Sequence, residues 1–385
     1  SPVEGRPGLL IRDSYGYSDA TLIIPPVLVE CLGCFDGQQT ALDLRAVLVR
    51  VTWELDVSQL EEHLKDTLNR AGFLENEAYE QMKLQRQREF AEAPVRLPAH
   101  AGSGYPGEAG ELSETLSEYM QGGPPASAER LIGIAAPHVS PFGGWECYRD
   151  AYSALTPDYR DRTFVVLGTS HYGEPDRFGL TRKNFITPFG EAATDLALVD
   201  RLAIQPAALM EDYCHSVEHS IEFQILFLQH LFGPKVRTLP ILCGSFARSI
   251  AAGTLPEDND EVKRFLGELA EIAAAREDLI WVLGIDMAHM GRRYGDPFTA
   301  TVETGEMLAA GARDKDRIAR INAADPDGFW DLVRENHDDL KWCGSAPAYT
   351  FLKAVPGSRG TLRRYQQWNI DDQSVVSFGA LAFSA

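Results

Sequence analysis

Apolar runs alternate with amphipathic stretches along most of the chain. Five runs have the length and β-branched content of buried strands. Helical patterns separate them, as in "IEFQILFLQHLF" (221–232) and "DNDEVKRFLGELAEIAAARE" (258–277). Buried strands alternating with helices predict an α/β layered domain with a largely parallel central sheet over residues 98–385. The five runs are "RLIGIAAP" (130–137), "RTFVVLGTS" (162–170), "VRTLPILCG" (236–244), "DLIWVLGID" (278–286) and "SVVSFGALAFS" (374–384).

A different pattern occupies residues 1–80. "GLLIRDSYGYSDATLIIPP" (8–26) predicts a hairpin, and "PVLVECLGCF" (26–35) predicts a short apolar helix. Two further helices are expected, one after an N-cap at Thr40 and one beginning at Ser58. These elements predict a small, winged-helix-like α+β domain. The segment 76–100 is polar and then punctuated by prolines, so residues 81–97 are predicted to be a linker.

Charge and composition limit the classes of partner that the protein is expected to bind. The 385 residues include 36 Lys and Arg against 56 Asp and Glu, a net charge of −20. This balance argues against nucleic acid and against an anionic membrane surface. No apolar stretch reaches the roughly 18 residues that span a bilayer, and "SPVEGRPGLL" lacks the pattern of a signal peptide. Six irregularly spaced cysteines do not make a disulfide framework, so a cytoplasmic location is expected.

Three of the nine histidines stand where predicted strands end: His138, His171 and His289. A single histidine in such a place is more often a hydrogen-bonded core or loop residue. In open α/β sheets, however, ligands bind at the carboxyl ends of the strands. Three imidazoles in equivalent positions therefore favour a shared metal, and neutral imidazole suits iron, copper or zinc.

Two other residues are candidates for the same site. Cys343 in "LKWCGSAPAY" precedes an expected helix, whose dipole stabilises a thiolate. Taken alone, a cysteine there is more often a small buried apolar residue. Asp286 precedes His289 by three residues and is expected to orient that imidazole or to offer an oxygen ligand. A loop cap is its alternative role.

Two short motifs have competing interpretations. His215, Glu218 and His219 form an H-x-x-E-H pattern typical of inverzincins. It lies where a helix starts, so we expect His215 outside the helix and unable to share a face with His219. Cys31 and Cys34 form one C-x-x-C without the second pair of a zinc ribbon, which favours helix packing. Neither a P-loop nor a G-x-G-x-x-G follows any strand.

Residues 98–384 resemble the Memo family, also called AmmeMemoRadiSam system protein B. The motifs that carry the resemblance occur in the order of the family. They are "PAHAGSGYPGEAGELSETLSEYM", "IAAPHVSPFGG", "VVLGTSHYG", "EHSIEFQILFLQ", "GIDMAHMG" and "WCGSAPAYTFLKA". The chain departs from the family pattern at Ser140-Pro141 and at Gly284-Ile285, so the wall that faces the substrate is expected to differ.

The resemblance implies a fold similar to class III extradiol ring-cleaving dioxygenases, which use non-haem ferrous iron. It implies a metal site of His138, His171, His289 and Cys343, with His289 as fourth ligand or acid–base group. The resemblance also implies that Glu218 and His219 belong to the family's own helix motif, which accounts for the H-x-x-E-H match. The candidate catalytic residues are His289, Cys343, His219 and Asp286.

Residues 1–80 resemble PqqD-like peptide-recognition domains through "IPPVLVECLGCFDGQQTALDL" and "LNRAGFL". That resemblance implies a leader peptide or partner protein that adds as a strand beside the hairpin; an accessory or dimerisation domain is the alternative. Together these features predict an oxidoreductase that uses non-haem iron, with copper or zinc as alternative metals. Its substrate would be small or borne on a peptide. The competing hypotheses are a metal-binding adaptor without turnover and a zinc hydrolase.

Overall fold

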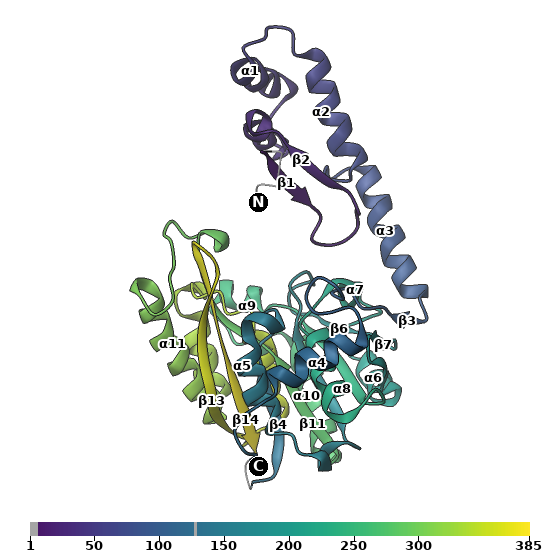
Figure 1. Ribbon diagram of the computed structural model, residues 1–385, viewed down its shortest axis with the longest axis vertical. Coiled ribbons are helices and arrows are strands. Elements are labelled where there is room, and N and C mark those ends of the chain that lie inside the picture. Colours follow the sequence, from purple (N-terminus) through teal and green to yellow (C-terminus); the bar gives the residue numbers. More distant parts are fainter. Residues whose placement is uncertain (1–6, 127–128) are drawn as a thin grey trace. The chain divides into compact units, whose positions relative to one another are not determined.

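The computed structural model describes residues 7–126 and 129–385. Its contacts divide the chain into two compact units, Ser1–Glu92 and Ala93–Ala385 (Figure 1). Each unit has hydrophobic clusters of its own. No helix in the described part of the chain is long and apolar enough to cross a membrane.

The first unit is a small α+β structure, as predicted. Strands β1 (Leu9–Arg12) and β2 (Thr21–Ile24) pair as an antiparallel hairpin. A 3₁₀ helix, η1 (Pro26–Phe35), follows, and then α1 (Ala41–Thr52) and α2 (Ser58–Arg70). Thr40 caps α1 through a reciprocal capping box with Asp43. Cys31 is fully buried in this unit's core, which agrees with the packing role expected for the C-x-x-C pair.

Most of the segment expected to be a linker, residues 81–97, is helical. Helix α3 spans Glu77–Glu92 and belongs to the first unit. The Asn76 side chain accepts hydrogen bonds from the backbone N–H groups of Ala78 (3.0 Å) and Tyr79 (3.2 Å), which satisfies donors of the first turn. Arg86 of α3 pairs with Asp19 beside the hairpin. The helix buries Phe90 but carries no continuous apolar stripe, so its sequence pattern did not reveal it.

The second unit is built on a sheet of twelve strands in the described residues. At its centre β4 (Leu131–Ala136), β11 (Leu279–Gly284), β5 (Thr163–Thr169) and β10 (Arg237–Cys243) run parallel in that order. Antiparallel pairing extends the sheet beyond β4 through β14 (Ser374–Ser384) to β12 (Asp286–Gly291) and β13 (Arg359–Asp371). Beyond β10 lie β8 (Gly190–Thr194), β7 (Asn184–Thr187) and β3 (Val95–Arg96), with β6 (Phe178–Leu180) and β9 (Ala208–Met210) as a side branch.

Both faces of the sheet are covered, which explains why its strands are almost continuously apolar. Along β5, Phe164 and Val166 join one hydrophobic cluster, whereas Val165 and Leu167 join the other. The first cluster contains α4 (Ala109–Tyr119), α5 (Pro141–Tyr152) and α8 (Glu222–Phe232). The second contains α6 (Leu196–Ala203), α10 (Asp260–Ala275), α11 (Gly305–Asn322), α12 (Pro326–Arg334) and α13 (Ser345–Ala354).

Short helices complete the second unit at the ends of these elements. They are α7 (Cys214–Val217), α9 (Ala247–Ala252), η2 (Pro157–Tyr159), η3 (Pro256–Asp258), η4 (Arg292–Tyr294) and η5 (Glu335–His337). The three-layer α/β architecture agrees with the class predicted from the sequence. The adjacency of β4, β11 and β5 places the carboxyl ends of these strands side by side.

Candidate metal centre

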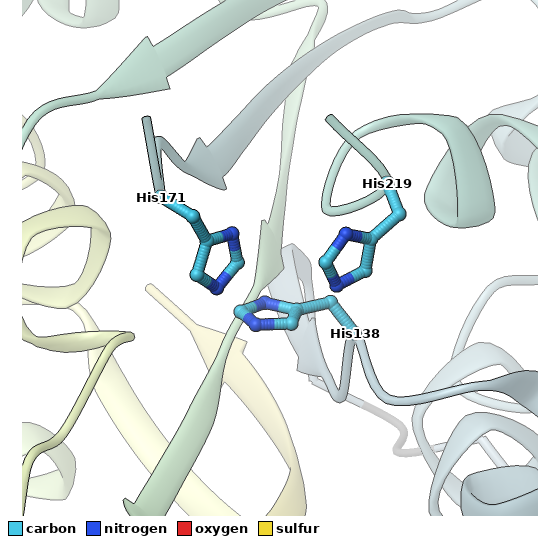
Figure 2. A group of neighbouring side chains, drawn as sticks. All are labelled: His138, His171 and His219. Carbon is cyan, nitrogen blue, oxygen red and sulfur yellow. The ribbon is translucent and has the colours of Figure 1, made fainter. Parts of the chain in front are cut away.

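Three imidazoles converge beside the carboxyl ends of β4 and β5. They belong to His138, His171 and His219, and each offers a ring nitrogen within 4.8 Å of the other two (Figure 2). The ring centroids are 5.0 Å (His138–His171), 5.3 Å (His138–His219) and 5.1 Å (His171–His219) apart. This is the spacing of groups that can share a single ion, since metal–imidazole bonds are about 2.0–2.1 Å long.

His138 follows β4 and is held from both sides. Its Nδ1 lies 2.9 Å from the carbonyl oxygen of Gly284, so Nδ1 carries the proton and Nε2 faces the cluster. Its backbone N–H donates to Asp286 Oδ1 (2.9 Å), and Oδ2 of the same carboxylate lies 3.5 Å from Nε2. Asp286 therefore fixes His138, whereas the sequence led us to expect that it would orient His289.

His171 follows β5 and is oriented by Glu218. The Nδ1–H donates to Oε2 of Glu218 (2.9 Å), and the backbone N–H of His171 donates to Oε1. A carboxylate on the far nitrogen fixes the tautomer and makes Nε2 a stronger donor to a metal. Glu218 is itself buried, and its backbone carbonyl accepts from Arg96 Nη2 (2.9 Å).

His219 lies in the turn before α8, which packs closely on two strand glycines. A Cβ at Gly168 of β5 would lie 2.5 Å from Ile221 Cγ1, and a Cβ at Gly284 of β11 would lie 2.3 Å from the Ser220 carbonyl oxygen. The Ser220 hydroxyl donates to the Thr169 carbonyl oxygen (2.7 Å) and fixes this approach. His219 was expected to be a catalytic residue and not a ligand, and the feature of the sequence that marked it was the H-x-x-E-H pattern.

A buried ion pair between Arg96 and Glu222 stabilises the turn before α8. Arg96 and Glu222 are fully buried and pair with one another, and Tyr105 donates its hydroxyl to Glu222. The backbone N–H groups of Ala99 and His100 also donate to Glu222, both at 3.1 Å. Every oxygen of this carboxylate is thus satisfied, which a buried charge requires.

Cys343 completes one side of the cluster. Its Sγ lies 3.3 Å from His138 Nε2 and 3.8 Å from the Asp286 carbonyl oxygen. It directly precedes Gly344, the N-cap of α13, as the sequence predicted. Burial raises the pKa of this thiol, but the positive charges and hydrogen bonds of His138, His289 and His171 outweigh burial and hold the pKa well below its usual value.

His289 lies near Cys343 but outside the group of three imidazoles. The expectation that it ends a core strand was wrong: β11 ends at Gly284, and His289 lies within β12, which pairs antiparallel with β14. Its Nδ1 contacts the Met287 carbonyl oxygen (2.9 Å), and its ring meets the Tyr294 ring edge-on at 5.0 Å. Burial opposes its charge, yet the neighbouring Cys343 raises the pKa of His289 overall.

The three clustered imidazoles differ in charge. Burial disfavours the charged form of His138, but Asp286 and Cys343 raise its pKa to about 9. Burial likewise opposes the charge on His171, and Glu218 raises its pKa well above the usual value. Burial and the charges of its histidine neighbours lower the pKa of His219. Two of the imidazoles must therefore release protons before a cation binds.

His215, the first residue of the H-x-x-E-H pattern, does not join the cluster. It lies in α7, which ends at Val217, whereas α8 begins only at Glu222. Its Nε2 contacts the Gly179 carbonyl oxygen at 3.0 Å. His215 and His219 therefore do not share a helix, and the geometry of an inverzincin zinc site is not formed.

A cavity of about 260 Å³ adjoins the cluster. Its walls combine hydroxyl-bearing and apolar residues, the charged Asp338 and Lys341, and two of the site residues. Among the lining residues are Thr169, Ser170, His171, Phe246, Trp342 and Cys343.

Comparison with known proteins confirms the family resemblance that the sequence motifs indicated. The family model described as "Memo-like protein" matches residues 96–382. A MEMO1 family protein of Aquifex aeolicus is 25% identical, over 97% of this chain and 95% of the relative. MEMO1 family protein TK1477 of Thermococcus kodakarensis is 30% identical, over 75% of this chain and 99% of the relative. The Aquifex alignment must extend into the first unit, whereas the Thermococcus protein matches a length close to that of the second.

Proposed function

The chain belongs to the Memo-like protein family, and from that premise we propose that its second unit is a non-haem metalloenzyme with redox or oxygen-using chemistry. The observation that carries the proposal is the convergence of His138, His171 and His219 within 4.8 Å. The Cys343 sulfur, 3.3 Å from His138 Nε2, adds a soft donor to the imidazoles. Such a donor set suits iron, copper or zinc and does not suit magnesium or calcium.

The residues of the chain have distinct roles in this proposal. His138, His171, His219 and Cys343 would hold the ion, and iron is the metal we favour because it supplies one-electron redox chemistry at such a site. Glu218 and the Gly284 carbonyl keep the far nitrogens of His171 and His138 protonated, which leaves Nε2 of each as the ligand atom. His289, whose pKa the neighbouring Cys343 raises against the effect of burial, would serve as a further ligand or as an acid–base group.

The adjoining cavity supports a small substrate or the reactive end of a larger one. Its volume of about 260 Å³ exceeds the roughly 150 Å³ that holds a benzene molecule. Because His171 and Cys343 form part of its wall, a molecule bound there lies next to the proposed metal. The free cysteines favour a reducing, cytoplasmic compartment as the place where this chemistry occurs.

Anaerobic purification followed by metal analysis tests this function. We expect one iron per chain, and we expect His171→Ala to lose most of it. The matched control is His230→Ala, because His230 is a half-buried histidine at the end of α8 outside the cluster. Equal metal content in both variants would contradict the proposed site. Zinc in place of iron would favour a hydrolase, and bound metal without any turnover would favour an adaptor.

A second candidate function belongs to the first unit, which we propose to be a peptide-recognition module. Its sheet consists of β1 and β2 alone in the described residues, so each strand has an outer edge for pairing. Leu9 and Ile23 on the hairpin are exposed. A leader peptide or partner protein adding as a third strand would gain backbone hydrogen bonds and cover these side chains.

A further inference from the structure

The segment that leads into Cys343 has a strained backbone. Asn336, His337, Asp338 and Lys341 have φ angles of 53°, 55°, 52° and 55°. This left-handed region is disfavoured for residues with side chains, and such conformations persist only where the surroundings hold them. Interactions from elsewhere in the unit must therefore fix the course of residues 336–343.

Helix α11 provides one of these constraints through Arg317, whose side chain is only 1% exposed. Its Nη1 donates to Asp338 Oδ1 (2.8 Å), and its Nη2 donates to the Leu332 carbonyl oxygen (2.9 Å). The guanidinium also lies over the Trp342 ring, 5.4 Å from its centroid. Arg317 thus holds two residues of the strained segment.

Asp314, one turn earlier on α11 and 0% exposed, joins this segment to the strands. Its Oδ1 accepts from Trp342 Nε1 (2.6 Å), and Trp342 directly precedes Cys343. Its Oδ2 accepts from the Ser377 hydroxyl (2.6 Å) and from the Tyr365 hydroxyl (2.8 Å). One carboxylate therefore meets three donors from three elements.

Ser377 connects Asp314 to the backbone next to His289. The Ser377 hydroxyl accepts from the backbone N–H of Ala288 (2.8 Å), the residue before His289. The backbone N–H of His289 in turn donates to the Leu340 carbonyl oxygen in the strained segment (2.9 Å). Asp314 is thus linked on one side to the neighbour of Cys343 and on the other side to the neighbour of His289.

We propose that Asp314 is a positioning residue that sets the relative placement of Cys343 and His289, outside the metal site itself. This inference rests on the proposed metal function of that site. A carboxylate buried in the core is costly, and packing alone would be served as well by an apolar residue. Its three bonds instead fix two functional side chains that come from separate strands and loops.

Titration of the full-length protein with Co²⁺ tests the inference, with sulfur-to-cobalt charge-transfer absorption as a readout of Cys343. Asn in Asp314→Asn has one acceptor oxygen and cannot serve all three donors. We expect Co²⁺ affinity to fall about 10–100-fold, the usual effect of losing such an outer contact, and the charge-transfer band to weaken. Asp339→Asn is the control, because Asp339 pairs with Arg313 at the surface of the same segment (2.9 and 2.5 Å).

A metal-free measurement separates this inference from the metal function. In histidine NMR spectra of the apo protein, the His289 signals should shift in Ser377→Ala but not in Tyr365→Phe. Both variants lose one bond to Asp314, but only Ser377 connects it to Ala288. If wild type fails to bind Co²⁺, the metal proposal fails, while apo spectra of Asp314→Asn still decide the role of Asp314, because the His289 signals should shift in that variant but not in Asp339→Asn. Unmoved His289 signals in Asp314→Asn, or a wild-type Co²⁺ spectrum in that variant, would overturn the inference.

Discussion

At the scale of single residues, Cys343 and its histidine neighbours shift one another's pKa values. Burial by itself favours the neutral thiol, yet the neighbouring imidazoles of His138, His289 and His171 hold the pKa of Cys343 well below its usual value. The pKa values of both histidines are raised in turn, by Asp286 and Cys343 for His138 and by Cys343 for His289, against the effect of burial. When no metal is bound, these shifts favour protonated imidazoles and a thiolate sulfur.

The pH at which the Cys343 thiol reacts should reveal the influence of the neighbouring histidines on its pKa. In the metal-free protein we expect Cys343 to react with iodoacetamide at pH values well below its ordinary pKa of 9.0, since the thiolate is the nucleophile. His289→Ala removes one positive charge, so the rate profile should move to higher pH. Mass spectrometry of the labelled peptides measures the rate for each cysteine.

Cys147, Cys214 and Cys243 provide internal references for that experiment. Burial raises the pKa of each of these thiols, so they should stay unlabelled where Cys343 reacts. An identical pH profile in wild type and His289→Ala would show that His289 does not set the charge on the sulfur.

At the scale of elements, the site depends on how closely the turn before α8 approaches the sheet. Gly168 and Gly284, on neighbouring parallel strands, leave the space that Ser220 and Ile221 occupy. That approach delivers His219 to His138 and His171. The glycines thus help to build the proposed metal centre, and the Gly284 carbonyl oxygen also accepts a hydrogen bond from His138 Nδ1.

Gly168→Ala should consequently disturb both stability and metal binding. The new Cβ would lie 2.5 Å from Ile221 Cγ1 and 2.6 Å from Ser220 Oγ, which forces the turn outward. We expect a loss of about 1–3 kcal/mol in the free energy of unfolding, typical of overpacking, together with weaker metal binding. Denaturant unfolding and metal titration measure the two effects.

Gly267→Ala is the matched control for Gly168→Ala. Gly267 lies within α10, and a Cβ there meets nothing within 4 Å. Alanine should therefore stabilise the helix by about 0.5–1 kcal/mol and leave metal binding unchanged. Should Gly168→Ala bind metal as tightly as this control, the close approach of the turn would not matter for the site.

Strands could be predicted from the sequence more reliably than the tertiary contacts between elements. The five apolar runs fall on β4, β5, β10, β11 and β14, because buried strands leave a strong local pattern. Helix α3 was missed, since a mostly polar helix lacks that pattern. The convergence of His219 with His138 depends on tertiary packing across 81 positions of sequence, and spacing alone does not report such packing.

At the scale of the whole molecule, the chain combines a unit that contains the proposed metal centre with a smaller unit that has its own core. All residues of the proposed metal centre lie in Ala93–Ala385. The Thermococcus relative matches 75% of this chain over 99% of its own length, so a protein of about the size of the second unit exists by itself. The first unit is therefore expected to contribute recognition and not metal ligands.

Separate expression of the two units tests this division. Residues 93–385 should bind metal with the same stoichiometry as the full chain, because every proposed ligand is retained. Affinity for a peptide-borne substrate should be lost, and the isolated first unit should bind that peptide. Loss of metal from a folded 93–385 protein, or absence of peptide binding by the first unit at high micromolar concentration, would contradict the respective part of the account.

X-ray absorption spectroscopy of the iron-loaded protein tests the central claim most directly. The account predicts one ion per chain with several imidazole nitrogens in its first coordination shell. It also predicts one sulfur at about 2.3 Å, the usual length of a metal–thiolate bond, and this sulfur should vanish in Cys343→Ser. A spectrum without histidine scattering, or a sulfur signal that persists in Cys343→Ser, would contradict a metal centre built from His138, His171, His219 and Cys343.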